Sequence, residues 1–327
     1  MTGTRLVTII CWIVSALVLT GLLIWLLTSV IFGSWGFFSN FNVFNINVGG
    51  FESLTGPFES RGVQMENANN VTSININWVA GDVTVIPYDG EDVKITEFAQ
   101  RELRNNEQMH VSNTNGVLRI NFRDRGNHRG RMPRKNLEVF VPQSLSTNLA
   151  DLTINSTSGS IEAAGFETSS LRISTVSASI KISDIVSSDI TTATTSGSIN
   201  AASLRAGRLN ASSVSGAINI SDANVPGVDV STTSGAISLE GTLDIINTST
   251  ISGGVNIRSS TVPGRIDSSS VSGGVNVYIP NEGEITVSHT AVSGRFSSDV
   301  PVIMQSNANY KFSSVSGSTN IHAIDGE

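Results

Sequence analysis

The chain has 327 residues, of which 14% are charged and 6% are aromatic, and its formal net charge is −7. Residues 1–150 carry 12 basic and 12 acidic side chains, whereas residues 151–327 carry 8 and 15. Nucleic-acid binding by the C-terminal half is excluded because phosphate recognition needs the opposite sign of charge. The single cysteine, Cys11, excludes a disulfide framework and a cysteine-based metal site. With so few bulky side chains, the composition favours a thin β-sheet interior filled by β-branched residues.

The N-terminal segment predicts a membrane anchor. Residues 6–32 contain no charged side chain and are long enough to cross the bilayer as one transmembrane helix. Residues 29–32 offer no small-residue cleavage site, which favours a retained signal-anchor over a cleaved signal peptide. Arg5 then places residues 1–5 in the cytoplasm and exports the remainder. We therefore expect a single-pass cell-membrane protein with a cytoplasmic N-terminus and an extracytoplasmic C-terminal domain.

The next segments are predicted to be a linker, residues 33–57, and an irregular β capping region, residues 58–150. Residues 71–78, 83–87 and 93–98 alternate as strands do, and Asp89-Gly90 predicts a hairpin. This capping region is expected to cover the membrane-proximal end of the domain that follows, because an open sheet edge invites aggregation.

Residues 151–327 consist of a repeat built around a Ser-Gly corner. Nine copies follow one another at intervals of 19, 19, 19, 19, 18, 20, 21 and 23 residues. The corner residue is Ala178 in the second copy and glycine in the others: Gly159, Gly197, Gly216, Gly235, Gly253, Gly273, Gly294 and Gly317. The pattern predicts an all-β, single-stranded β-solenoid of about nine coils of about 19 residues, with a less regular N-terminal part and a preceding transmembrane α-helix.

Each repeat alternates with period two on both sides of the corner, which predicts two short strands and two turns. Such a unit cannot bury its apolar face alone, so successive coils must stack about 4.8 Å apart. Glycine at the corner permits positive φ and close approach of neighbouring coils. Ala178 breaks this rule, so its coil is expected to have a different turn or a strained one.

Two further segments, Trp78-Val79-Ala80-Gly81-Asp82-Val83-Thr84-Val85-Ile86-Pro87 and Leu137-Glu138-Val139-Phe140-Val141-Pro142, accompany the recurrent Ser-Gly-Ser-Ile tetrads. Together, over roughly residues 60–325, they resemble the bacterial putative-adhesin family of β-strand-repeat proteins. That resemblance implies the solenoid fold and a setting in the cell envelope, behind a membrane anchor. It implies no activity.

The repeat contains no arrangement typical of an enzyme, and we predict no catalytic residue, no metal site and no cofactor. Catalytic β-helices gather acidic and basic side chains on one sheet. Here the acids occur singly, mostly at expected turns: Glu162, Asp184, Asp189, Asp222, Asp229, Asp244, Asp267 and Asp299. Glu107 and His110 have Glu-x-x-His spacing, but that spacing binds a metal only along a helix.

One segment of residues 123–135 is strongly basic, with six cations and one acid. On the exported side of a membrane it could contact anionic lipid headgroups or anionic wall polymers, and the alternative is a solvated loop between two strands. The candidate anion-binding residues are Arg123, Arg125, Arg129, Arg131, Arg134 and Lys135.

The functional hypothesis is a membrane-anchored extracytoplasmic β-solenoid that acts as an adhesin-like binding, scaffold or sensor module of the cell envelope. Its partner on the solenoid face would be an envelope protein or a glycan. Two alternatives remain at this stage. One is a carbohydrate-active enzyme on a β-helix, and the other is a cytoplasmic-facing scaffold that polymerises.

Overall fold

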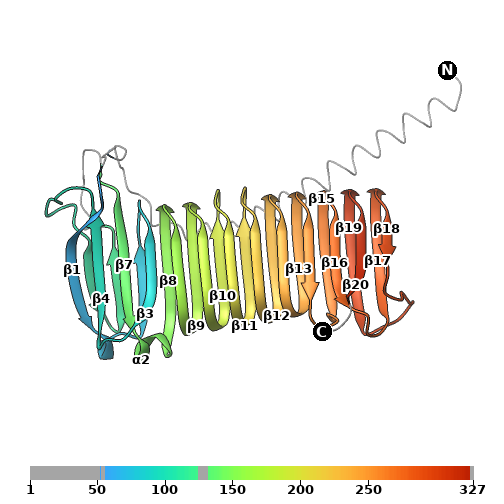
Figure 1. The fold of residues 1–327 in the computed structure, drawn as a ribbon, viewed down its shortest axis with the longest axis horizontal. Coiled ribbons are helices and arrows are strands. Elements are labelled where there is room, and N and C mark those ends of the chain that lie inside the picture. Colours follow the sequence, from blue (N-terminus) through green and yellow to red (C-terminus); the bar gives the residue numbers. More distant parts are fainter. Residues whose placement is uncertain (1–51, 53–55, 124–131, 325–327) are drawn as a thin grey trace, which may run out of the picture.

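The computed structural model describes residue 52 and residues 56–123 and 132–324. They form one elongated stack of coils, in which the strands run across the long axis (Figure 1). Two short helices, η1 (Ala68–Asn70) and α2 (Gln143–Ser146), interrupt the strands. The strands are β1 (Glu59–Asn67), β2 (Ser73–Asn77), β3 (Val83–Tyr88), β4 (Asp92–Ala99), β5 (His110–Thr114), β6 (Val117–Asn121), β7 (Lys135–Pro142), β8 (Leu149–Ser158), β9 (Ile161–Ser177), β10 (Ile180–Thr194), β11 (Ile199–Ser213), β12 (Ile218–Ser234), β13 (Ile237–Ser252), β14 (Val255–Ser259), β15 (Arg265–Ser272), β16 (Val275–Pro280), β17 (Ile285–Ser293), β18 (Phe296–Ser298), β19 (Ala308–Ser316) and β20 (Thr319–Ile324).

The central coils pair in parallel and in register, which confirms the predicted β-solenoid. Ile180 of β10 lies between Ile161 of β9 and Ile199 of β11, and the same one-coil offset continues along each strand. This register places like side chains above one another and forms a fully buried column of β-branched residues in the interior. The column contains Ile161, Ile180, Ile199, Ile218, Ile237, Val255 and Val275.

The Ser-Gly corners stack directly on one another, as predicted. A Cβ atom on Gly216 would lie 1.7 Å from the carbonyl oxygen of Gly197, and one on Gly273 would lie 2.1 Å from that of Gly253. Gly273 has a φ of +146°, but Gly216 is not in the positive-φ region. Close approach of neighbouring coils therefore accounts for glycine at all eight corners that carry it, and backbone conformation accounts for it at only some.

Ala178 marks a change in the corner conformation. Gly159 in the preceding coil has a φ of +105°, whereas neither Ala178 nor Gly197 has a positive φ. The N–H of Gly197 donates to Oγ1 of Thr194 at 3.1 Å, and that hydroxyl donates to the carbonyl of Ala178 at 3.1 Å. The sequence led us to expect either a different turn or a strained turn in this coil, and the structure shows a different turn.

Each central coil bends a second time six residues after the Ser-Gly corner, and the residue at this bend has a positive φ. The side chains that tolerate this conformation best are glycine and short polar residues. The positions and their φ values are Gly165 (77°), Asp184 (56°), Ser203 (54°), Asp222 (49°) and Gly241 (151°). Asp184 and Asp222, which the sequence placed at turns, lie at this bend.

The coils do not stack in chain order at either end. At the N-terminal end, β2 pairs with both β6 and β8, and β3 pairs with both β7 and β9. At the C-terminal end, β19 lies between β15 and β17, and β20 lies between β16 and β18. The first coil (β2 and β3) and the last coil (β19 and β20) are thus each inserted between two other coils, one layer in from the end of the stack. The expectation that successive coils always stack is wrong at both ends.

The N-terminal end is covered by antiparallel strands. β4 pairs with β7, β1 pairs with β4, and β5 pairs with β6. Because β7 lies between β3 and β4, these two strands do not form the hairpin predicted from Asp89-Gly90. The C-terminal end has no such cover within the described residues: β17 and β18 form the last layer (Figure 1).

The predicted transmembrane segment, residues 6–32, and most of the predicted linker lie outside the described residues. Within the part of the chain that the structure describes, no helix is long and apolar enough to span a membrane.

Candidate ligand-binding groove

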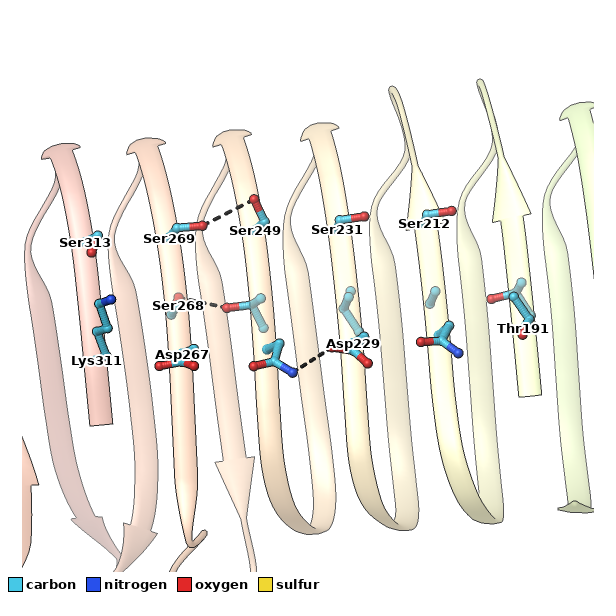
Figure 2. Close-up of a pocket in the computed structure, with 16 residues that line it drawn as sticks. Thr191, Ser212, Asp229, Ser231, Ser249, Asp267, Ser268, Ser269, Lys311 and Ser313 are labelled. Carbon is cyan, nitrogen blue, oxygen red and sulfur yellow. Dashed lines mark hydrogen bonds between the residues drawn. The ribbon is translucent and has the colours of Figure 1, made fainter. Parts of the chain in front are cut away.

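A shallow polar groove of about 640 Å³ runs along one face of the solenoid, across the coils from β10 to β19 (Figure 2). Two in-register rows of outward side chains border it. The mixed row consists of Thr191, Asn210, Asp229, Asn247, Asp267 and Lys311. The serine row consists of Ser212, Ser231, Ser249, Ser269 and Ser313. With one residue per coil in each row, the groove repeats about every 4.8 Å.

Hydrogen bonds between neighbouring coils order part of this groove. Asn247 Nδ2 donates to Asp229 Oδ1 at 2.6 Å, and Ser269 Oγ donates to Ser249 Oγ at 3.3 Å (Figure 2). Beneath the rows, the buried Thr248 Oγ1 donates to Ser268 Oγ at 2.7 Å. These bonds hold side chains at fixed spacing, so the surface is preorganised for a repeating ligand.

Several polar groups in the rows have no protein partner within the described residues. The hydroxyls of Ser212, Ser231 and Ser313 make no side-chain hydrogen bond, and Lys311 forms no ion pair there. All three serines are partly exposed and Lys311 is exposed. The groove therefore presents free donors and acceptors to solvent along one line.

The two carboxylates in the mixed row are each engaged by an arginine. Arg208 Nη2 donates to Asp229 Oδ2 at 2.6 Å, and Arg265 Nε donates to Asp267 Oδ2 at 2.8 Å. Asp189, next to Arg208 in the adjacent coil, lies outside the groove lining. Both carboxylates are thus already engaged by side chains of the protein itself.

A second hollow of about 1250 Å³ follows the bend that carries the positive-φ residues. It is lined by charges of both signs, among them Asp222, Arg205 and Glu282. One of its lining residues, Arg258, lies over the ring of Tyr278 at 4.9 Å, and Tyr278 stacks on His322 with ring centroids 4.9 Å apart.

No group of three or more histidine, cysteine or acidic residues that could hold a metal occurs in the described parts of the chain. His322 Nδ1 lies 3.2 Å from Asp299 Oδ2, and His289 packs against Phe296. Glu107 is held by Arg101 at 2.8 Å, and its pKa is lowered to about 2, chiefly by this hydrogen bond. Glu107 therefore stabilises the N-terminal cap through Arg101.

The basic segment of residues 123–135 divides into three parts. Arg125, Arg129 and Arg131 lie outside the described residues. Arg134 is exposed, as an anion-binding residue must be. Arg123 is 9% exposed, and burial lowers the pKa of its guanidinium. The prediction that Arg123 belongs to a surface patch is thus wrong, because its side chain lies mostly in the protein interior.

Lys135 has an internal structural role, so its assignment to an anion-binding surface is also wrong. Its side chain is 0% exposed, and Nζ lies 2.9 Å from Glu97 Oε2. The ammonium also donates to the backbone carbonyls of Glu107 and Phe122 and lies 4.3 Å from the Phe122 ring centroid. Burial lowers the pKa of Lys135 to about 8, while Glu97 opposes this shift. The column of stacked Ser-Gly corners ends at Lys135, because Gly81 lies directly against the Lys135 carbonyl.

The groove was not predicted from the sequence, where its aspartates were interpreted as single acids, mostly at turns. One signal for it exists. Ser212, Ser231, Ser249, Ser269 and Ser313 recur at spacings of 19, 18, 20 and 44 residues, in phase with the corners. The 44-residue step skips one corner copy, which matches the inserted coil.

A parallel, in-register solenoid with polar outward ladders defines the class: a β-strand-repeat protein with long, regular faces. The chain belongs to the Toastrack DUF4097 family, whose model matches residues 71–323. The family assignment agrees with the solenoid fold and, in part, with the resemblance to the putative-adhesin family inferred from the sequence.

Among solved structures, a "putative lipid binding protein" from Parabacteroides distasonis is similar with a TM-score of 0.52 at 14% identity, covering 82% of this chain and 98% of that one. A "putative adhesin" from the same organism gives a TM-score of 0.46 at 13% identity, with coverages of 81% and 97%. A "putative adhesin" from Bacteroides fragilis gives 0.44 at 10%, with 83% and 100%. No curated protein matches the chain. At these identities the likeness concerns the fold alone.

Proposed function

We propose that this protein is a membrane-anchored, extracytoplasmic binding module of the cell envelope that holds an extended, hydroxyl-rich or amide-rich polymer, such as a glycan, along the polar groove. The observation that carries the proposal is the line of free hydroxyls in the serine row, with Lys311 at the end of the mixed row. A glycan chain presents its own hydroxyls at regular intervals, which suits a surface that repeats coil by coil.

The energetics favour a long ligand. One neutral hydrogen bond contributes about 0.5–1.5 kcal/mol net, so a single coil cannot hold a sugar firmly. The groove extends over six coils, or roughly 24 Å, and linked contacts along it add through effective concentration. Affinity should therefore rise steeply with ligand length.

The anchor and the topology remain part of the proposal. The uncharged residues 6–32 and the position of Arg5 support a single pass with the solenoid outside. Contact with anionic lipid or wall polymer near the N-terminal end is proposed for Arg125, Arg129, Arg131 and Arg134. Arg134 is the exposed member of this set within the described residues.

Replacing Ser231 with tryptophan should lower retention of the protein on insoluble polysaccharide at least tenfold, because the indole fills the middle of the groove. Ser238→Trp is the matched control. Ser238 is also a partly exposed outward serine, but it lies on a different stretch of the coil, outside the groove lining. The measurement is co-sedimentation of the full chain in detergent with peptidoglycan, chitin and cellulose.

Equal retention of the two tryptophan variants would contradict the proposal, as would the absence of any retention of the parent protein. Release of reducing ends from these polymers, abolished by Asp229→Asn or Asp267→Asn, would instead establish the carbohydrate-active enzyme. We propose a non-catalytic role because both carboxylates are held by arginines.

A further inference from the structure

The two ends of the solenoid differ in how their strand edges are protected. At the N-terminal end, the edge strand β1 carries Glu59, Arg61 and Glu66 and has a register shift between Ser60 and Gly62. Charges and bulges of this kind prevent an edge from pairing with another strand. The other edge strand there, β5, has only five residues. These features disfavour pairing with a further strand at this end, where Val63 and Met65 of β1 are nevertheless exposed.

At the C-terminal end, β18 is also short, with three residues, but the other edge strand, β17, lacks these devices. β17, Ile285–Ser293, is nine residues long and contains no acidic residue, lysine, arginine or proline. It pairs with β19 on one side, and on the other side only Ile285 is bonded, to the loop that returns from β18. Within the described residues, the rest of this edge is free.

The backbone groups available on that edge follow from Ile285. Its N–H donates to the Pro301 carbonyl and its carbonyl accepts from Ile303 N–H, so its backbone faces away from β19. Backbone groups alternate between the two edges of a strand. The N–H and C=O groups of Val287, His289 and Ala291 therefore face the open end.

Apolar side chains surround this open edge. Val292 is 72% exposed and Met304 is 100% exposed, and Val302 and Phe296 are exposed as well. His289 lies against Phe296, and its Nε2 is buried with no hydrogen-bond partner in the described part of the chain. The end layer thus exposes to solvent apolar side chains of the kind that are buried in the inner coils.

We propose that this end binds the same end of a second copy, so that two solenoids join tail to tail through antiparallel pairing of β17 with β17. The occupant is a second copy because the free backbone groups are symmetric about His289. A two-fold axis at His289 pairs Val287 with Ala291 of the other copy and His289 with its own equivalent, and all of these residues have outward N–H and C=O groups. Because this two-fold contact uses the C-terminal end of both copies, assembly through it stops at the dimer.

This register makes a specific prediction for the outward side chains. Ser288 of one copy lies opposite Thr290 of the other, and both residues are exposed in the single chain. Like charges directly opposite one another across antiparallel strands repel, and unlike charges attract. Ser288→Glu/Thr290→Glu should weaken the dimer at least tenfold, whereas Ser288→Glu/Thr290→Lys should retain it. The Ser288→Glu change is common to both variants and places its carboxylate beside Lys311 of the same copy, so it suits the fold in each of them.

The experiment measures the micelle-corrected mass of the full chain in detergent by size-exclusion chromatography with light scattering, over a range of concentrations. The expected result is a dimer for the parent and the Glu/Lys variant, and a monomer for the Glu/Glu variant, with the same circular-dichroism spectrum for both variants. A monomeric parent protein would overturn the proposal. This holds also if hydrogen exchange shows that another segment of the same chain protects the amides of Val287–Ala291. Equal masses for the two variants would overturn the proposed register and the proposal with it.

Discussion

Gly216→Ala is expected to destabilise the solenoid by roughly 3 kcal/mol, near the upper end of the usual cost of overpacking a packed interior. The added Cβ would lie 1.7 Å from the carbonyl oxygen and 2.4 Å from the carbonyl carbon of Gly197 in the adjacent coil. Both atoms belong to the backbone, and both coils are fixed by their ladders on either side. Relief thus requires two coils to move apart, which weakens the hydrogen bonds between them.

Gly227→Ala is the matched control, because Gly227 lies in the same coil. Its added Cβ would lie 3.7 Å from the nearest atom, an ordinary contact, and its φ is not positive. The measurement is the midpoint of thermal unfolding by circular dichroism for both variants. A Gly216→Ala midpoint indistinguishable from the Gly227→Ala midpoint would show that the corner column is not closely packed.

The period and the corners could be predicted from the sequence because each depends on local chemistry. Glycine occupies eight of the nine corners, where neighbouring backbones touch, and an isoleucine or valine two residues later enters the interior in seven coils, so both recur with the period of the coil. The order of coils at the two ends does not depend on such local signals. Every coil offers its neighbours the same column of aliphatic side chains and the same corner. The Gly273 coil could therefore accept the Gly294 coil or the Gly317 coil, and the structure places Gly317 there.

The error at Lys135 has a different origin. The run of charged residues 123–135 favours a solvated loop. The prediction from this run did not take account of the period-two alternation of inward residues that begins at Lys135. Lys135 is in phase with Leu137, Val139 and Val141, all of which are buried along β7. A lysine at the first inward position of a strand needs a buried acid as its partner. Glu97, inward on β4, is that partner, but only the antiparallel pairing of β4 with β7 brings the two together.

Lys135→Met is expected to lower the free energy of unfolding by about 3–5 kcal/mol, the usual cost of removing one partner of a buried ion pair. Methionine fills the space of the lysine stem, so the loss comes from the Glu97 carboxylate, which is 1% exposed and, among the described residues, retains only the Met109 N–H as a donor. Lys181→Met is the matched control. Its ion pair with Glu162 is similarly short, at 2.8 Å, but mostly exposed, so it should contribute about 0–1 kcal/mol.

The double variant Lys135→Met/Glu97→Gln separates the cost of an unpaired charge from the loss of packing. It should recover most of the stability lost in Lys135→Met, since the Glu97→Gln change then leaves no unpaired charge at the site of the former ion pair. The pH dependence gives an independent check. The pKa of Lys135 is about 8 in the folded protein and 10.5 when unperturbed, so between these values the unfolded chain binds more protons. Stability from this group therefore increases as pH rises from 8 towards 10.5, and that increase should be absent in Lys135→Met. If unfolding in urea gives parallel pH profiles for the parent and Lys135→Met, Lys135 is not the buried, charged partner of Glu97.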